Sequence, residues 1–343
     1  KRMKTIRRRA LMTAFAGVLA LGLSAASYAQ QPTVLKLSHQ FPASTGPNGD
    51  FRDQLAKNFA AEVEKKTNGS LKIEVYPGSS LMKTRSQFSA LRKGTLDMSV
   101  LPLAYGSGEV PQVSITLMPA LVQGYEQGLR WKTAPIGKAL ETLLESKGIK
   151  IVTWVWQAGG IASRDKPIVK PSDAKGLKVR GGDKNMDLMI QGAGGSPTNL
   201  PSSEIYSAMS TGVLDGALTS STSLISYRLN ETSKAVTTAR NKSFWYMFEP
   251  ILISMDAWKR LTPEQQKVVM EVGASLEPFA MAGAKRDDER LAKVYEDAGV
   301  TVVDMDQAAF DQWVAIAKET SYKQFAAKVE NGQALIDMAL AVK

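Results

Sequence analysis

Cysteine is absent from this chain of 343 residues, and histidine occurs only once. Without a thiol the protein forms no disulfide, performs no thiolate catalysis and holds no cysteine-ligated metal or iron–sulfur cluster, and a lone imidazole excludes any site that needs two. Aromatic residues at 7%, 27 glycines and 15 prolines lie in the ordinary range of folded domains, which excludes collagen-like structure and wholesale disorder. On a prior of about 150 residues per domain, the length predicts two domains.

Positive charge is concentrated at the start of the chain. The formal net charge is +10, and six positive charges lie in the first nine residues, with no acid before residue 30. The residues after 29 therefore carry only +4, and their basic side chains are scattered. Because nucleic-acid binding needs a basic patch or stripe, we expect no nucleic-acid partner.

A secretory signal peptide is predicted over residues 1–29. The basic cluster is followed by an apolar run over residues 10–26 and by the small residues Ser27 and Ala29 at the −3 and −1 positions of a cleavage site. The alternative is a membrane anchor, but the run is shorter than the roughly 20 residues that a span needs. No later segment has a comparable apolar run, so we expect a soluble protein in the periplasm.

Strand and helix signals alternate along the rest of the chain. In its first part the expected strands cover 33–38, 71–76, 97–103 and 150–156, and the expected helices cover 50–66, 87–93 and 125–146. In the second part the expected strands cover 177–180, 213–218 and 244–255, and the expected helices cover 184–191 and 202–209. Helical signal also covers 262–298, with Thr262 as the expected N-cap, and 307–342.

This alternation predicts an α/β protein with a two-lobed periplasmic-binding-protein (clamshell) fold, a hinge cleft and long C-terminal helices. The expected organisation is a first α/β lobe over 30–155, a second α/β lobe over 156–255 and a helical C-terminal part over 256–343 that packs across both lobes. At this point only fold analogy favours a binding protein over an enzyme.

Several blocks of residues carry a resemblance to a known family. They are Gly69–Pro77 with Leu81, Gly94–Met98, Lys170–Arg180, Gly192-Ala193 with Pro197, Glu204–Tyr206 with Ala208, Gly212–Gly216 and Leu261–Gln266. In order and spacing they resemble the solute-binding subunits of tripartite ATP-independent periplasmic (TRAP) transporters, over nearly the whole chain after residue 29. The resemblance implies a periplasmic protein that captures an organic acid and delivers it to membrane permease subunits driven by an ion gradient.

Arg180 is the strongest candidate for a ligand-binding residue. It ends the predicted strand over 177–180, just before Gly181-Gly182, at the edge where α/β sheets present ligands. Its planar guanidinium offers parallel N–H donors to a carboxylate, each bond contributing roughly 1.5–3 kcal/mol. The alternative is a surface arginine paired with an acid. In the proteins that this chain resembles, the matching arginine holds the substrate carboxylate.

Thr219, Asn199 and Ser202 are further candidates that the resemblance suggests. Relatives often have an asparagine at the position of Thr219, whose hydroxyl can also bond a ligand, although the run that follows it, Ser220–Thr222, is equally typical of a helix N-cap. Asn199 and Ser202 fall where relatives place side chains that flank the ligand.

Five more candidates lie at the ends of predicted strands. His39 and Phe41 end the first strand, Tyr105 ends another, and Phe244 and Trp245 begin the strand over 244–255. For each of them the alternative is a purely structural role, since a single histidine is often structural and aromatic side chains often belong to the core.

One departure from the family bears on the ligand. Some relatives carry a second arginine where this chain reads Gln157–Ala162, without a cation. We therefore expect a monocarboxylate rather than a dicarboxylate held at both ends, with Gln157, at the end of its strand, as a neutral donor.

Enzymatic function is not indicated. The glycine-rich runs lack the lysine of a P-loop, no Gly-x-Ser-x-Gly motif occurs, and only His39 could serve a catalytic triad. We expect no cofactor and no metal. A carboxylate-based hydrolase remains open, because any two acids can meet in a fold, and so does a secreted sensor that presents its ligand to a receptor.

Overall fold

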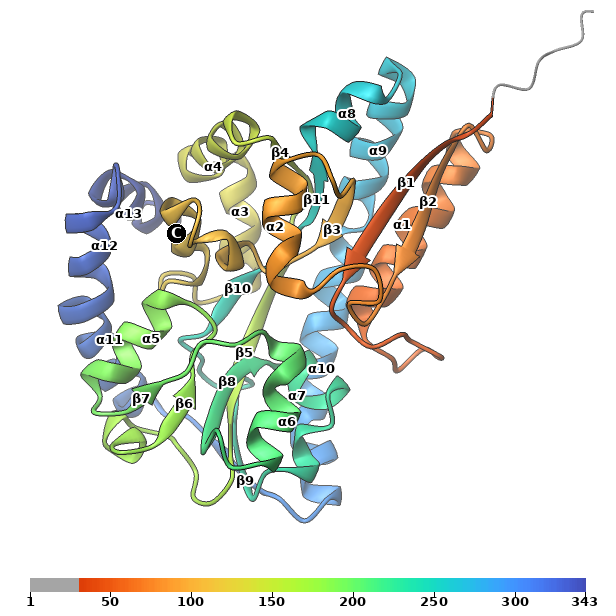
Figure 1. Ribbon diagram of the computed structural model, residues 1–343. Helices are drawn as coiled ribbons and strands as arrows, with labels where there is room; N and C mark the ends of the chain where they lie inside the picture. The colour runs from red at the N-terminus through yellow and green to blue at the C-terminus, as the bar shows by residue number, and fades with distance from the viewer. Residues whose placement is uncertain (1–30) are drawn as a thin grey trace, which may run out of the picture. The chain divides into compact units, whose positions relative to one another are not determined.

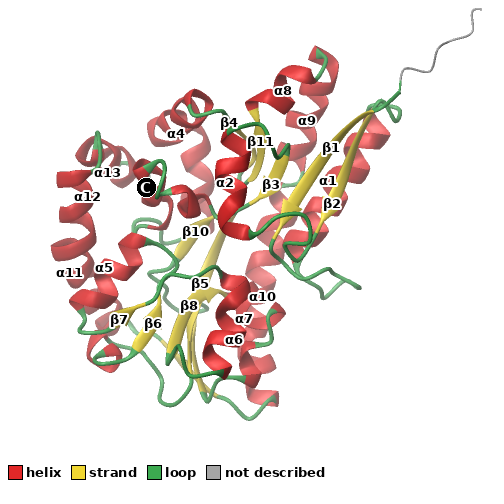
Figure 2. Ribbon diagram, viewed as in Figure 1, coloured by secondary structure: helices red, strands yellow, loops and turns green. Residues whose placement is uncertain are grey.

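Two β-sheets organise the computed structural model, which describes residues 31–343 (Figure 1 and Figure 2). The signal peptide expected over 1–29 lies outside the described residues. Among the helices of residues 31–343, none combines the length and the apolar content that crossing a membrane requires. Each sheet with the helices packed on it forms one lobe, so the α/β two-lobed prediction is confirmed.

The first sheet has five strands in the order β2-β1-β3-β11-β4. Their bounds are Leu71–Tyr76, Thr33–His39, Met98–Val100, Ile251–Ser254 and Ile149–Thr153. β1 runs parallel to β2 and β3, with helices α1 (Phe51–Lys66) and α2 (Thr84–Arg92) as crossovers, and β11 is antiparallel to β3 and β4. The βαβαβ pattern read from the sequence is therefore present.

The second sheet follows the order β12-β9-β5-β8-β6-β7, and β10 pairs with β5. The bounds are Thr301–Asp304, Ala235–Thr238, Trp156–Ser163, Gly216–Ser220, Lys178–Arg180, Ser196–Pro197 and, for β10, Tyr246–Phe248. Three helices connect these strands, namely α5 (Lys184–Gly192), α6 (Ile205–Ser210) and α7 (Ser221–Ser226). Apolar clusters cover both faces of this sheet, one around Met189 and Trp313 and the other around Leu224 and Tyr295.

Two neighbouring extended segments connect the sheets. The chain passes from β4 to β5 through Trp154-Val155 and returns from β10 to β11 through Glu249-Pro250, where the Glu249 N–H donates to the Val155 carbonyl at 2.8 Å. The prediction of one strand over 244–255 is wrong, because Pro250 has no N–H to continue a ladder and the chain changes sheets there. β11 thus lies in the first sheet, although its residues fall in the range expected for the second lobe.

The C-terminal part contacts both lobes. Its elements are α8 (Met255–Arg260), α9 (Pro263–Ser275), α10 (Glu277–Asp297), β12, α11 (Gln307–Ala317), α12 (Lys323–Lys328) and α13 (Gly332–Leu340). The long helix α10 packs against α1 in the first lobe and against α7 and β5 in the second, and it also contacts α9 (Figure 1). Thr262 caps α9 as predicted, in a capping box with Gln265. The strand β12 was not predicted.

Shorter turns complete the described chain. The predicted helix over 125–146 is interrupted before Pro135 and divides into α3 (Tyr125–Arg130) and α4 (Pro135–Ser146). Single 3₁₀ turns cover Leu103–Gly106, Pro111–Leu117, Trp131–Thr133, Pro171–Ala174, Ser202–Glu204 and Leu229–Glu231, and a π-helical turn covers Lys318–Tyr322. The turn over Leu103–Gly106, shortly after β3, contains Tyr105.

Candidate functional site

Arg180 lies between the two lobes and is almost fully buried, with 1% of its surface exposed. It is the last residue of β6, as predicted. Nε donates to the Leu200 carbonyl at 3.0 Å, Nη1 to the Leu218 carbonyl at 2.8 Å and Nη2 to the Tyr105 hydroxyl at 2.7 Å. Tyr105 belongs to the first lobe, so this guanidinium connects both lobes.

The guanidinium of Arg180 keeps donor capacity for a ligand. Its five N–H groups make three hydrogen bonds within residues 31–343, which leaves one N–H on each terminal nitrogen without a partner there. Gly182, at φ +103°, lies against the same group, and a Cβ at Gly182 would come within 3.0 Å of Nη1. The backbone conformation therefore favours glycine, and any side chain there would also press on the guanidinium of Arg180.

Tyr105 connects Arg180 to two more of the predicted residues. It lies in a 3₁₀ turn rather than at the end of a strand, because β3 already ends at Val100. Its hydroxyl also accepts from the Ser202 backbone N–H at 3.0 Å. Burial acts to raise the pKa of Tyr105, but the nearby guanidinium groups of Arg180 and Arg85 outweigh it and hold that pKa below its ordinary value.

Arg85 is a residue of this site that the sequence analysis missed. It lies in the first turn of α2, with its guanidinium carbon 4.3 Å from the centre of the Tyr105 ring, and it donates a hydrogen bond to the Asn199 side chain in the second lobe. A cation in the first helical turn opposes the helix dipole, and this local conflict is a signal that could have marked it. Asn199 thus lies at the site, held by Arg85.

Tyr105 is one of the residues that line a cavity of about 570 Å³. Others are Arg85, Asn199, Lys184, Asp187 and Lys328, whereas Arg180 does not line it. Burial raises the pKa of Asp187 to about 6, with the charges of Arg180 and Arg85 acting in the opposite direction. The cavity thus combines three cationic side chains with one acid that is easily protonated.

Asp183 lies three residues after Arg180, at the end of the loop Gly181-Gly182, and caps helix α5. Its Oδ1 accepts from the Asn185 backbone N–H at 2.6 Å, while its buried Oδ2 has no partner within residues 31–343. Burial raises the pKa of Asp183 to about 7, and the neighbouring charge of Asp187 acts in the same direction. The sequence analysis did not identify either acid.

Thr219 and Gln157 are buried near the crossing but differ in their surroundings. Thr219, next to the Leu218 carbonyl that holds Arg180, makes no side-chain hydrogen bond within the described residues, and it is Ser220 that caps α7. Gln157 is the second residue of β5, so the prediction that it ends its strand is wrong. Its amide nitrogen donates one of its two N–H groups to Glu249, and its amide oxygen has no partner within residues 31–343.

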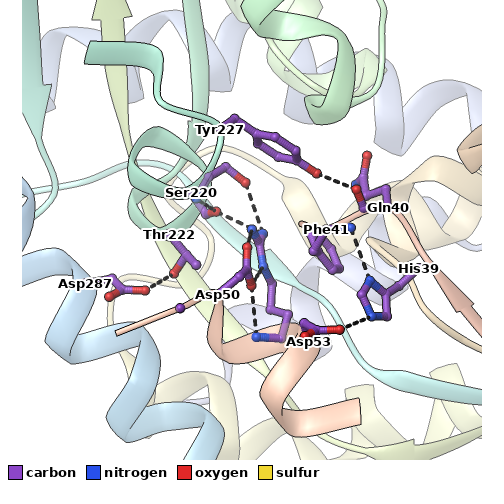
Figure 3. Close-up of polar contacts among 12 residues, drawn as sticks. His39, Gln40, Phe41, Asp50, Asp53, Ser220, Thr222, Tyr227 and Asp287 are labelled. Carbon is purple, nitrogen blue, oxygen red and sulfur yellow. Dashed lines mark hydrogen bonds and ion pairs between the residues drawn. The ribbon is translucent and has the colours of Figure 1, made fainter. Parts of the chain in front are cut away.

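His39 and Phe41 belong to a separate buried cluster (Figure 3). The His39 ring nitrogens contact Asp53 Oδ1 at 3.1 Å and the Phe41 N–H at 3.2 Å, and the two rings stack with centroids 5.5 Å apart. Burial acts to raise the pKa of Asp53, but its bonds to His39, Lys57 and Ser44 lower it below its ordinary value. The structure therefore gives both residues structural contacts.

Phe244 and Trp245 do not begin a strand as predicted, because β10 starts only at Tyr246, and the two aromatic side chains have different contacts. Trp245 donates from Nε1 to the Gly181 carbonyl at 3.3 Å and so supports the loop that follows Arg180. Phe244 packs on Trp313, with ring centroids 5.1 Å apart, inside the core of the second lobe. Trp245 therefore lies beside the site, and Phe244 has the contacts of a core residue.

A second buried guanidinium, that of Arg52, lies next to the crossing segment. It pairs with Asp50 at 2.6 Å and approaches Glu249 Oε2 at 3.4 Å. Burial raises the pKa of Glu249 to about 7, Arg52 lowers it in part, and Asp50 raises it further. Within residues 31–343 no cluster of three or more histidines, aspartates or glutamates has an arrangement that could hold a metal ion.

Comparisons with known proteins agree with this architecture. The family described as "Bacterial extracellular solute-binding protein, family 7" (DctP) matches residues 43–328. A "Solute-binding protein" of Albidiferax ferrireducens is 49% identical over 334 residues, covering 97% of this chain and 99% of that protein. The "C4-dicarboxylate-binding periplasmic protein DctP" of Rhodobacter capsulatus is 29% identical over 85% of this chain and 86% of that protein.

Solved structures give the same result. The crystal structure of a TRAP periplasmic solute-binding protein from Rhodoferax ferrireducens with bound malonate is 51% identical, has a TM-score of 0.88 and covers 90% of this chain and 98% of that chain. One from Sulfitobacter sp. NAS-14.1 with bound β-D-galacturonate is 25% identical, has a TM-score of 0.81 and covers 90% and 100%.

Glu249 makes stability depend on pH. Because the fold raises its pKa from 4.5 to about 7, the protonated form is stabilised, and this contribution is complete below about pH 4.5 and lost as pH rises through 7. The variant Glu249→Gln keeps the neutral form at every pH. We expect its unfolding free energy, relative to wild type, to rise by about 1–3 kcal/mol between pH 5 and pH 8.

Urea denaturation at pH 5, 6.5 and 8 measures this difference. Other buried acids, such as Asp183, contribute equally in both proteins and cancel. The matched control is Glu64→Gln, at an exposed position of α1. A difference between Glu249→Gln and wild type that stays constant over this range contradicts the assignment.

Proposed function

Since this chain belongs to family 7 of the bacterial extracellular solute-binding proteins, the DctP family, we propose that it captures a small organic acid between its lobes and holds the ligand's carboxylate on Arg180. The observation that carries this proposal is a buried guanidinium whose three protein partners are all neutral oxygens and which keeps two N–H donors. A carboxylate supplies both the missing negative charge and the two acceptors.

The remaining residues around Arg180 support recognition rather than chemistry. Tyr105, Ser202, Asn199 and Thr219 offer hydroxyl, amide and backbone groups, which orient a polar ligand by hydrogen bonds. His39 is bonded to Asp53 in a different cluster. We therefore propose binding without chemical conversion of the ligand.

Two ligand classes are candidates. The absence of a cation from Gln157–Ala162 favours a monocarboxylate. Arg85, however, lies over the ring of the same Tyr105 whose hydroxyl contacts Arg180, and it provides a second positive charge. The protein with 51% identity holds malonate, a short dicarboxylate. Arg85 and this relative together favour a short dicarboxylate, and malonate is our first test ligand.

We place this binding step in the periplasm, at the start of transport. Ligand binding between the lobes stabilises the closed arrangement by the difference in affinity between the closed and open states. TRAP permease subunits then receive the ligand from the closed protein, and an ion gradient drives its passage.

Removal of the Arg180 side chain tests the carboxylate site. We expect Arg180→Ala to weaken malonate binding at least about 100-fold, because two charge-assisted hydrogen bonds contribute roughly 1.5–3 kcal/mol each. Calorimetry measures the affinity, and mass spectrometry of the recovered ligand should show unchanged malonate. Arg92→Ala removes an arginine bonded to Glu109 within the first lobe and serves as the control. If Arg180→Ala binds malonate within threefold of wild type, the assignment is wrong.

The role of Arg85 is tested by comparing malonate with its monoamide. We expect Arg85→Ala to lower the affinity for malonate about tenfold and that for the monoamide less than twofold, because only malonate has a second negative charge for Arg85. Lys93→Ala, at the other end of the same helix, is the matched control. Equal losses for both ligands would show that Arg85 acts only through its contact with Tyr105.

Transport is tested in cells that carry the protein together with the permease genes next to its own. We expect uptake of labelled malonate to stop when the ion gradients are collapsed and to continue when ATP is depleted with the gradients maintained. Uptake with the opposite dependence contradicts a TRAP permease as the partner.

A further inference from the structure

Arg52 is buried at the boundary between the lobes but does not contact Arg180. It is the second residue of α1, with 1% of its surface exposed. Within the first lobe its Nε and Nη2 donate to the two carboxylate oxygens of Asp50, at 2.9 and 2.6 Å, and its guanidinium carbon lies 3.7 Å from the centre of the Phe41 ring. These contacts are local, because all three residues lie within a short segment of the chain.

The remaining nitrogen of Arg52 reaches out of its own lobe. Nη1 donates to Ser223 Oγ at 3.0 Å and to Ser220 Oγ at 3.3 Å, both in the segment that begins α7 of the second lobe. It also approaches Glu249, in the segment where the chain crosses between the sheets. One guanidinium thus contacts both lobes and the crossing segment.

The second-lobe partners of Arg52 are directly connected to the ligand site. Strand β8 supplies the Leu218 carbonyl that holds Arg180, and Ser220 ends β8 and caps α7. A further contact across the boundary lies in the same region, where the Tyr227 hydroxyl donates to the Gln40 carbonyl at 3.0 Å (Figure 3). The position of α7 relative to the first lobe therefore fixes the walls of the ligand site.

We propose that Arg52 is a positioning residue that fastens the closed arrangement of the lobes and thereby slows release of the ligand; this inference rests on the proposed function. When the lobes separate, the bonds to Asp50 remain and only those to Ser220 and Ser223 break. Those two bonds consequently differ between the closed and open states, and only a difference of this kind shifts the equilibrium. Since Asp50 already neutralises Arg52, this guanidinium is not a carboxylate clamp like Arg180.

The first experiment measures the rate at which malonate dissociates separately from the rate at which it associates. Stopped-flow measurements give both rates for malonate with wild type, Arg52→Lys and Ser223→Ala. We expect the dissociation rate to rise about tenfold in each variant and the association rate to change less than twofold, because the lost contact forms only after the lobes close. Ser226→Ala is the matched control, since Ser226 lies on the same helix and its buried hydroxyl has no partner within residues 31–343.

Spin labels measure the closure directly. Because the chain has no cysteine, Lys66→Cys in the first lobe and Ser207→Cys in the second, both exposed, provide one pair of labels. We expect Ser223→Ala to shift the distances between the labels to longer values at subsaturating malonate, relative to wild type and to Ser226→Ala. If Arg52→Lys fails to fold, the rates and label distances of Ser223→Ala alone test the role of Arg52.

If wild type binds malonate, two outcomes overturn the proposal. One is a dissociation rate within twofold of wild type in Ser223→Ala, together with unchanged label distances. The other is a loss of affinity that lies entirely in the association rate. If wild type itself binds no malonate, malonate is not the ligand, and the role of Arg52 is tested by the label distances measured without ligand. Equal distance distributions in wild type and Ser223→Ala then overturn the role of Arg52. A shift to longer distances in Ser223→Ala supports it.

Discussion

A guanidinium keeps its proton under all ordinary conditions, so an arginine that is withdrawn from solvent must find negative charge or several acceptors. Two arginines at the boundary between the lobes are subject to this constraint, because Arg52 and Arg180 each have only 1% of their surface exposed. Arg52 satisfies it within the protein, through Asp50. Arg180 has only the oxygens of Leu200, Leu218 and Tyr105, which are neutral, so its direct contacts leave the charge to be balanced by a bound anion.

Because the two lobes are connected beside these arginines, the contacts of each guanidinium depend on how the lobes are arranged. Both arginines take partners from both lobes, and two adjacent segments that connect the sheets are joined by a hydrogen bond from Glu249 to Val155. A movement of one lobe about these segments therefore alters the surroundings of both guanidinium groups at once. Recognition of the anion and closure of the lobes are coupled because they use the same boundary.

The sequence predicts the parts of this arrangement that depend on local signals. The periodicity of α1 and the cap of α9 by Thr262 are local and were predicted, and Arg180 was found at the end of its strand because Gly181-Gly182 follows it. Arg52 was missed because its contacts in the second lobe lie about 170 positions away in the sequence. Gln157 was misplaced for a related reason, since the change of sheets after Val155 is set by tertiary pairing.

Charge balance around the site also favours an anionic ligand. The charges of Arg180 and Arg85 are balanced if Asp183 and Asp187 are both ionised, which leaves Lys184 and Lys328 of the cavity unmatched. Burial, however, raises the pKa of Asp183 to about 7 and that of Asp187 to about 6, so that near neutral pH Asp183 is ionised only about half of the time. The site consequently has a net positive charge at neutral pH, and this charge increases as the solution becomes more acidic.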